Sequence, residues 1–215
     1  MKTKTYFLLF AAHLTLSISM YAQDVLKPDL SKLSDSKSWT IFNLEATFDT
    51  DVYLNANAGD GLLYLKDVEF KNGKIEVDIK GKNNPGRSFV GVAFHGLNNK
   101  TFDAVYFRPF NFENPQRNSH SVQYISMPGN DWSKLRQEHP GKYENIISPV
   151  PDPDAWFHAT ILIRFPLVKV FVNNANEPSL VVNQISDRET GWVGFWVGNG
   201  SDGNFRNLTI TFEPE

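Results

Sequence analysis

Short runs of alternating apolar and polar residues follow one another along most of this chain, and this pattern constrains its fold most. In the run KIEVDIKG, for example, Ile75, Val77 and Ile79 alternate with charged residues, which is the period of a strand with one buried face. Such runs recur about every ten residues, with Gly, Asn, Asp and Pro between them. The pattern predicts an all-β fold, an antiparallel β-sandwich of the jelly-roll kind.

Three local signals predict particular elements within this sandwich. Asn72 and Gly73 separate two alternating runs, which predicts a hairpin, because an Asn-Gly pair suits a tight turn. The runs WFHATILIRF and LVKVFVNN, with Pro166 between them, predict a second hairpin. Asp131 is a candidate N-cap for one short helix over roughly residues 131–139.

The start of the chain predicts export from the cytoplasm. Two lysines precede an apolar stretch over residues 6–17, and small residues lead to a cleavage point after Ala22. The predicted division of the chain is a signal peptide at 1–22, an N-terminal leader at 23–38 and one domain at 39–215. No later stretch approaches the ~20 apolar residues of a membrane-spanning helix. We therefore expect a secreted or periplasmic protein without a membrane span.

Composition excludes several classes of site. The chain has no Cys, which excludes disulfide scaffolds, Cys-ligated zinc and thiol catalysis. The formal net charge of -3 becomes -5 without Lys2 and Lys4, and no basic stripe is visible, so we expect no nucleic-acid partner.

Residues 107–154, called the central segment below, interrupt the alternation with a long irregular insert. This segment gathers three arginines, two histidines, several aromatic residues and closely spaced prolines. A β-scaffold that departs from its own pattern with such side chains usually does so to hold a ligand. We therefore expect a ligand groove on one sheet face, covered by the central segment.

Several motifs resemble the concanavalin A-like, laminin-G-like jelly-roll superfamily. GWVGFWVGNGSDGNFRNLTI is similar to its closing strands, and FKNGKIEVDIKG and WFHATILIRFPLVKVFVNN are similar to earlier strands. Within the superfamily, the chain most resembles secreted 3-keto-disaccharide hydrolase domains, formerly a domain of unknown function. The resemblance covers roughly residues 39–212. It implies the β-sandwich fold and a saccharide as ligand.

The catalytic motifs of that superfamily are incomplete in this chain. The hydrolase domains often carry Tyr-Glu-x-Gln, whereas the nearest stretch here has Gln123 without a preceding Glu. The glucanase branch carries Glu-x-Asp-x-x-Glu, whereas Glu76 and Asp78 are followed by Gly81 at the third acidic position. A retaining glycosidase needs two carboxyl groups about 5–5.5 Å apart, so the catalytic residues do not carry over.

The candidate ligand contacts are side chains whose chemistry suits a hydroxyl-rich or acidic molecule. Arginine presents a rigid fork of donors, an amide both donates and accepts, and an aromatic ring stacks on the apolar face of a sugar. The candidates for ligand binding are Arg108, His120, Gln123, Trp132, Arg136, Tyr143 and Glu144. The candidates for general acid or base catalysis are Glu76, His95, His120 and Glu144.

Each candidate also has a structural interpretation. Glu76 fits a solvated strand face, His95 a strand end bonded to a loop, and Trp132 a contact that holds the helix on the sheet. Trp196 alternates with glycines and can project over a groove. The oxygen-rich loops at Asp60 and at residues 199–204 suit either turns or a structural calcium ion. We expect no catalytic metal and no cofactor.

Three functions remain open at this point. The first is recognition of a saccharide or glycan in the groove, which we favour slightly because the usual acidic positions are empty. The second is a glycoside hydrolase or lyase that acts on a modified, 3-keto disaccharide, as the resemblance implies. The third is a structural or adhesion domain without a small ligand.

Overall fold

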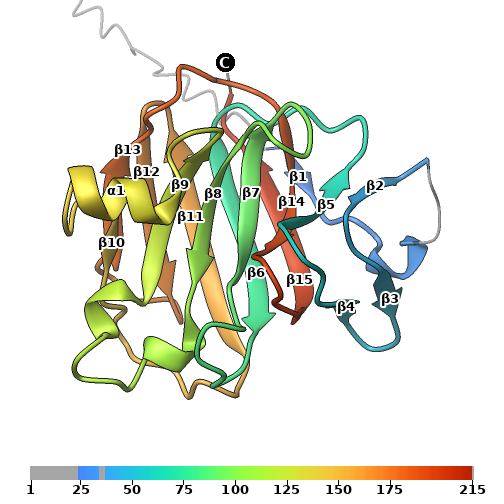
Figure 1. Cartoon of the computed structure of the whole chain (residues 1–215). Coiled ribbons are helices and arrows are strands. Elements are labelled where there is room, and N and C mark those ends of the chain that lie inside the picture. Colours follow the sequence, from blue (N-terminus) through green and yellow to red (C-terminus); the bar gives the residue numbers. More distant parts are fainter. Residues whose placement is uncertain (1–23, 34–36, 215) are drawn as a thin grey trace, which may run out of the picture.

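The computed structural model describes residues 24–33 and 37–214, and the predicted signal peptide lies outside these residues. Two antiparallel sheets pack face to face and form a β-sandwich, which confirms the predicted fold class (Figure 1). We call them the back sheet and the front sheet. None of the helices in the described ranges is long and apolar enough to cross a bilayer.

The back sheet has the strand order β13–β12–β11–β6–β15–β4–β3, and β1 also pairs with β15. Its strands are β1 (Val25–Leu26), β3 (Ala46–Phe48), β4 (Val52–Leu54), β6 (Gly73–Lys80), β11 (Phe157–Arg164), β12 (Leu167–Val172), β13 (Leu180–Asn183) and β15 (Gly203–Phe212). The strand β1 lies within the predicted leader, so part of that leader joins the sheet.

The front sheet has the strand order β10–β9–β8–β7–β14–β5–β2. Its strands are β2 (Trp39–Phe42), β5 (Gly61–Leu65), β7 (Val90–Gly96), β8 (Phe102–Phe107), β9 (Val122–Met127), β10 (Glu144–Asn145) and β14 (Trp192–Val197). The described helices are the short η1 (Leu30–Lys32), η2 (Pro109–Asn111) and η3 (Asn118–His120) and the α-helix α1 (Trp132–Glu138).

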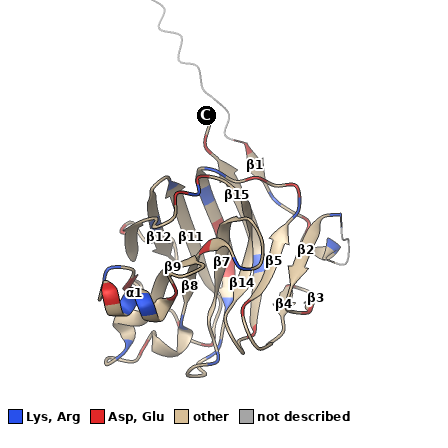
Figure 2. Ribbon diagram, turned by 45° about the horizontal axis from the view of Figure 1, so that its top comes forward, with Lys and Arg blue, Asp and Glu red and all other residues tan. Residues whose placement is uncertain are grey.

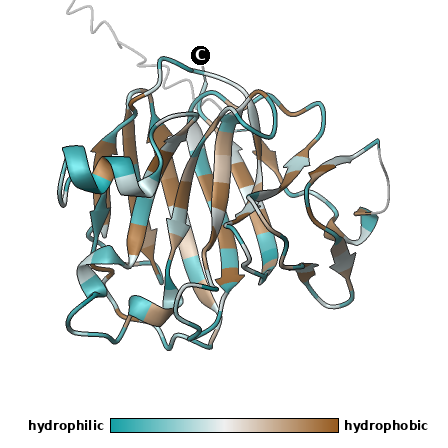
Figure 3. Ribbon diagram, in the orientation of Figure 1, coloured by the Kyte–Doolittle hydropathy of each residue, from teal (hydrophilic) through white to brown (hydrophobic). Residues whose placement is uncertain are grey.

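The two sheets bury their faces to different extents. Strand β6 alternates strictly between buried and half-buried residues, because only its inner face packs against the other sheet. Strands β7 and β8 are buried along their whole length. Figure 3 shows the brown, apolar strands beside the mostly teal helix α1, which crosses in front of the front sheet. The outer face of the front sheet is therefore partly covered as well.

The structure corrects one predicted hairpin and confirms the other. Asn72 and Gly73 do not close a hairpin: the run before them forms β5 in the front sheet, and the run after them forms β6 in the back sheet. The Asn72 side chain instead accepts a hydrogen bond from the backbone N–H of Phe165 at 2.8 Å. The second predicted hairpin is confirmed as β11 and β12, which pair around Pro166.

The central segment is less irregular than predicted. It contains η2, η3, the strand β9, the helix α1 and the short strand β10. Asp131 caps α1 as predicted, because its carboxylate accepts hydrogen bonds from the backbone N–H groups of Ser133 and Lys134. The segment thus adds two strands to the edge of the front sheet and places α1 over its outer face.

Candidate functional site

A groove runs across the outer face of the front sheet and consists of two adjoining cavities of about 420 and 750 Å³. Both cavities are lined by Pro85, Gly86, Phe89 and Trp132, so they form one continuous depression. We call the smaller cavity the basic end and the larger one the aromatic end. Their boundary lies between the loop before β7 and the helix α1.

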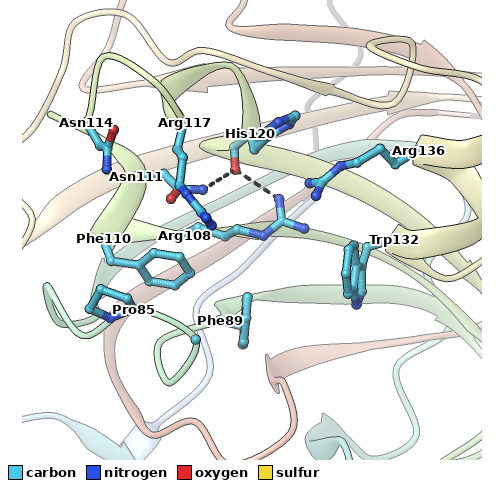
Figure 4. A pocket seen from close by; sticks show the side chains of 11 residues that line it. Pro85, Phe89, Arg108, Phe110, Asn111, Asn114, Arg117, His120, Trp132 and Arg136 are labelled. Carbon is cyan, nitrogen blue, oxygen red and sulfur yellow. Dashed lines mark hydrogen bonds between the residues drawn. The ribbon is translucent and has the colours of Figure 1, made fainter.

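The basic end gathers cationic and amide side chains from three different parts of the central segment. Figure 4 shows the guanidinium groups of Arg108, Arg117 and Arg136 directed toward a common space, with the ring of Trp132 beside them. The complete lining is Pro85, Gly86, Phe89, Arg108, Phe110, Asn111, Asn114, Arg117, His120, Trp132 and Arg136.

Arg108 is the most deeply placed of these cations, with 4% of its surface exposed. Its Nη2 donates to the Tyr106 hydroxyl and to Gln123 Oε1, and its Nη1 donates to the backbone carbonyl of His120 at 2.9 Å. Asn111 Nδ2 donates to the same carbonyl at 3.1 Å (Figure 4). Burial lowers the pKa of Arg108, and the nearby charge of Arg136 acts in the same direction. The guanidinium is therefore held in one position, and its charge is only partly compensated.

Glu144 connects the cationic side chains from beneath the groove. Its carboxylate accepts two hydrogen bonds from Arg136, at 2.8 and 2.6 Å, and lies 2.9 Å from Nδ1 of His120 and 3.8 Å from Nη1 of Arg108. Desolvation of the carboxyl acts to raise its pKa, but the bonds and charges of these partners outweigh it and lower the pKa. Glu144 therefore stays ionised and is occupied by its partners.

The helix α1 presents two side chains to the groove because they are four residues apart. Trp132 and Arg136 lie on one helix face, and the Arg136 guanidinium carbon is 5.0 Å from the centroid of the Trp132 ring. Figure 2 shows basic and acidic residues together on this helix. Trp132 remains 48% exposed, although a large apolar ring is usually buried. Its position at the boundary makes it accessible to a ligand from both ends.

The aromatic end has a floor made by two rings that meet above a glycine. In the register of the sheet, Gly91 pairs with Tyr106 on one side and with Trp196 on the other. Because Gly91 has no side chain, these rings approach to a centroid distance of 4.8 Å. The indole N–H of Trp196 is buried, and it interacts with the carboxyl of Asp60.

Asp60 also lines the aromatic end. Burial raises the pKa of its carboxyl, and a neighbouring interaction with Trp196 opposes this rise. A carboxyl whose pKa is raised can serve as a proton donor or as a hydrogen-bonding group for a hydroxyl. Asp131 lines the same cavity, but its carboxylate is already used as the cap of α1.

The structure brings most of the predicted ligand-binding residues together. Arg108, His120, Trp132 and Arg136 line the basic end. Gln123 and Glu144 are buried directly behind it, paired in register on β9 and β10, and they contact the arginines. They support the site and do not line it.

Three predicted residues lie elsewhere. Glu76 is on the outer face of β6, in the back sheet, where it pairs with Lys74 at 2.8 Å. His95 is fully buried at the end of β7, where Nε2 lies 2.8 Å from the carbonyl oxygen of Lys71 and Nδ1 accepts from Gln184. Tyr143 faces the core and contacts the Tyr124 ring. None of the three lines either cavity.

Sequence reasoning overlooked several residues that line the groove. Phe89 and Phe110 contribute rings that contact each other edge to face at 5.5 Å. Asn111 follows Arg108 directly, and its buried Oδ1 has no hydrogen-bond partner among the described residues. Arg117 was visible only as one of the three arginines of the central segment. For Phe110, Asn111 and Arg117, the available signal was their closeness to Arg108 in the sequence.

A structural calcium ion remains a prediction. In the described ranges, no group of three or more His, Cys, Asp or Glu side chains is arranged to hold a metal. Asp202, in one of the two oxygen-rich loops, accepts hydrogen bonds from Tyr53 and Lys82.

Comparison with known proteins identifies the fold. No family model and no curated protein matches the sequence. Among solved structures, the carbohydrate-binding module CBM66 from Bacillus subtilis is 14% identical with a TM-score of 0.58, and the match covers 82% of this chain and 97% of that one. A predicted glycosyl hydrolase from Parabacteroides distasonis is 16% identical with a TM-score of 0.52, over 86% and 93% of the two chains.

A third similar structure is the exoplasmic/lumenal domain of VIP36 in its form bound to Ca²⁺ and Man₃GlcNAc. It is 13% identical with a TM-score of 0.55, and the match covers 86% of this chain and 88% of that one. At such identities the likeness shows the fold alone, and this fold agrees with the one that the resemblance implied. This protein therefore has the concanavalin A-like, lectin-type β-sandwich fold.

Proposed function

We propose that this protein is a saccharide-recognition domain whose ligand occupies the groove on the outer face of the front sheet. The observation that carries the proposal is the combination of aromatic rings and fixed hydrogen-bonding groups along one depression. Phe89 and Trp132 line both ends of the groove, and Trp196 lines the aromatic end. Aromatic rings can pack on the apolar C–H face of a sugar, while polar groups bind its hydroxyls.

One buried polar atom in the lining favours a polar ligand. Asn111 Oδ1 has no hydrogen-bond partner within the described structure, although the residue is almost completely buried. A buried polar atom without a partner costs about 1–3 kcal/mol. Sugar hydroxyls donate hydrogen bonds, so a ligand at the basic end can satisfy this acceptor.

The fold is consistent with this proposal. CBM66 is a carbohydrate-binding module, and the VIP36 domain was solved with Man₃GlcNAc. We further propose that the protein acts outside the cytoplasm, in a secreted or periplasmic location. The apolar, signal-like start of the sequence supports export, and the VIP36 domain is itself exoplasmic or lumenal.

Hydrolysis of a modified disaccharide is a second candidate, and Asp60 is the observation that favours it. Its carboxyl lines the groove, and burial raises its pKa, as a general acid requires. However, Glu144 is held by Arg136, and Asp131 caps α1. Among the described residues that line or support the groove, these bonds leave no second carboxylate free to act with Asp60, and binding is therefore the better supported function.

The proposal is tested with a glycan array followed by calorimetry on the purified protein. Trp132→Ala should weaken binding of any glycan hit by about tenfold or more, which corresponds to about 1.4 kcal/mol. Phe48→Ala is the matched control, because Phe48 is an aromatic residue of similar exposure (40%) on β3 of the back sheet. Equal affinity of wild type and Trp132→Ala would place the ligand elsewhere.

The same experiment separates the other candidate functions. Incubation of each hit with the protein, followed by product analysis, detects cleavage. Products that disappear in Asp60→Asn would favour the hydrolase. Absence of any hit on the array would remove the saccharide proposal and favour the structural or adhesion domain.

A further inference from the structure

The basic end of the groove carries more positive charge than a neutral sugar requires. Three arginines line it, and none of its lining residues is Asp or Glu. Across the described residues, the only carboxylate within 4 Å of these three guanidinium groups belongs to Glu144, which Arg108 and Arg136 share. Three positive charges against one negative charge leave a net charge of +2 with His120 neutral.

The position of Arg108 makes this excess costly. Its guanidinium is buried, and its hydrogen bonds go to uncharged acceptors: the Tyr106 hydroxyl, the Gln123 amide and the His120 carbonyl. A buried cation without a full counter-charge is destabilising, and the like charge of Arg136 adds to this. The stability of the fold does not require this buried, uncompensated positive charge, whereas a bound anion compensates for the charge.

Arg117 supplies a free cation at the mouth of the same cavity. It precedes η3, its side chain is exposed, and no acidic side chain of the described chain lies within ion-pair distance. Figure 4 shows its guanidinium on the opposite side of Arg108 from Arg136. The fork of an arginine matches the two oxygens of a carboxylate or of a sulfate group.

We propose that the saccharide bound in the groove is acidic, and that its carboxylate or sulfate ester enters the basic end between Arg108, Arg117 and Arg136. This inference rests on the proposed function and specifies its ligand class. The sugar ring that bears the anion then lies against Phe89 and Trp132, at the boundary of the two cavities. The following rings extend over Tyr106 and Trp196 in the aromatic end.

The charge of the two ends sets the direction of the ligand. The lining of the aromatic end has two carboxyl groups, Asp60 and Asp131, against one guanidinium group, Arg87, whereas that of the basic end has three guanidinium groups and no carboxyl group. The groove thus accepts an acidic unit at one end of the ligand and a neutral unit at the other. A uniformly acidic polymer fits it less well than a saccharide with one terminal acidic unit.

A glycan array with neutral, uronate-bearing and sulfated saccharides tests the proposal. We expect the acidic glycans to bind, with the uronate and sulfate groups of the array showing which of the two anions is preferred. Each acidic hit is then compared by calorimetry with its carboxyl-reduced or desulfated counterpart. The counterpart should bind at least tenfold more weakly, and the affinity for the acidic hit should fall as NaCl rises.

Arg117→Gln provides the decisive variant, because Arg117 is exposed and its loss leaves the core intact. It should weaken binding of the acidic hit by about tenfold and weaken binding of the neutral counterpart much less. Arg164→Gln is the control, since Arg164 is 64% exposed in its side chain and pairs with Glu213 on the back sheet. This control should bind both ligands as the wild type does.

Two results would overturn the inference while the proposed function survives. One is that the array yields only neutral glycans whose binding depends on Trp132. The other is that Arg117→Gln weakens acidic and neutral ligands equally, which would assign Arg117 to general hydroxyl contacts. If no glycan binds at all, both the proposed function and this inference are refuted.

Discussion

Replacement of Glu144 should destabilise the folded protein through the loss of one buried charge. We predict that Glu144→Gln lowers the free energy of unfolding by about 3 kcal/mol at pH 7. The substitution keeps the shape of the side chain and removes its charge, so packing is preserved. What is lost is the anion that faces Arg136, His120 and Arg108.

The magnitude follows from the burial of the partners. Removing one member of a buried ion pair typically costs about 3–5 kcal/mol, because the other charge remains buried. Arg136 has 34% of its side chain exposed, so water compensates for part of the loss, whereas Arg108 has only 5% exposed. The expected value therefore lies at the lower end of that range.

Urea unfolding at several pH values is the appropriate assay. With an m value of about 2–3 kcal/mol per M, the midpoint of Glu144→Gln should fall by roughly 1 M at pH 7. The folded state lowers the pKa of Glu144, so its contribution is present above the pKa of the unfolded chain and is lost as pH falls through the folded pKa. The difference from wild type should therefore shrink in acid, below roughly pH 4.

Glu213→Gln serves as the control for this series. It also removes a carboxylate paired to an arginine, but Arg164 is mostly exposed, so the cost should be about 0–1 kcal/mol. If Glu144→Gln and Glu213→Gln have equal effects, or if the Glu144→Gln difference persists unchanged in acid, the account of the buried ion pair is refuted.

Three further predictions concern other parts of the groove. Gly91→Ala should destabilise the fold by about 2 kcal/mol or more in urea unfolding, because its Cβ would lie 2.2 Å from the Val105 carbonyl oxygen. Asp131→Ala removes the cap of α1 and should cost about 1 kcal/mol, with a parallel loss of glycan affinity. Asp60→Asn should raise the melting temperature at pH 7 but not at pH 3. Because burial raises the pKa of Asp60, its protonated form stabilises the fold in acid, and this contribution is lost as pH rises. Equal melting shifts at both pH values would contradict this.

The alternation of apolar and polar residues predicted the sandwich because a half-buried strand leaves a local signature. It did not predict which sheet each strand joins. The run before Asn72 and the run after Gly73 have the pattern of a hairpin, yet they form β5 and β6 in different sheets. Membership of a sheet depends on contacts between distant segments, which no local period encodes.

The candidate site shows the same difference between local signals, which the sequence contains, and contacts between distant segments, which it does not. Arg108, Trp132 and Arg136 could be grouped in advance because they lie in one unusual stretch, and the cap at Asp131 indicated a helix that presents two of them. Glu76 was misplaced because its charged face belongs to the back sheet. Phe89 was overlooked, and Asp60 was assigned to a turn or a calcium loop, because both reach the groove from segments that are distant in the sequence.

The hydrogen bonds that hold Arg108 have a consequence for the thermodynamics of association. Its guanidinium is fixed by the Tyr106 hydroxyl, the Gln123 amide and the His120 carbonyl before any ligand arrives. Its rotamer entropy is therefore lost during folding, and docking requires little further ordering there. The solvent-exposed Arg117, in contrast, must be immobilised on docking at a cost of about 0.5–1.5 kcal/mol. Within one cavity, the rigid Arg108 thus contributes to selectivity for the ligand, and the adaptable Arg117 contributes to its capture.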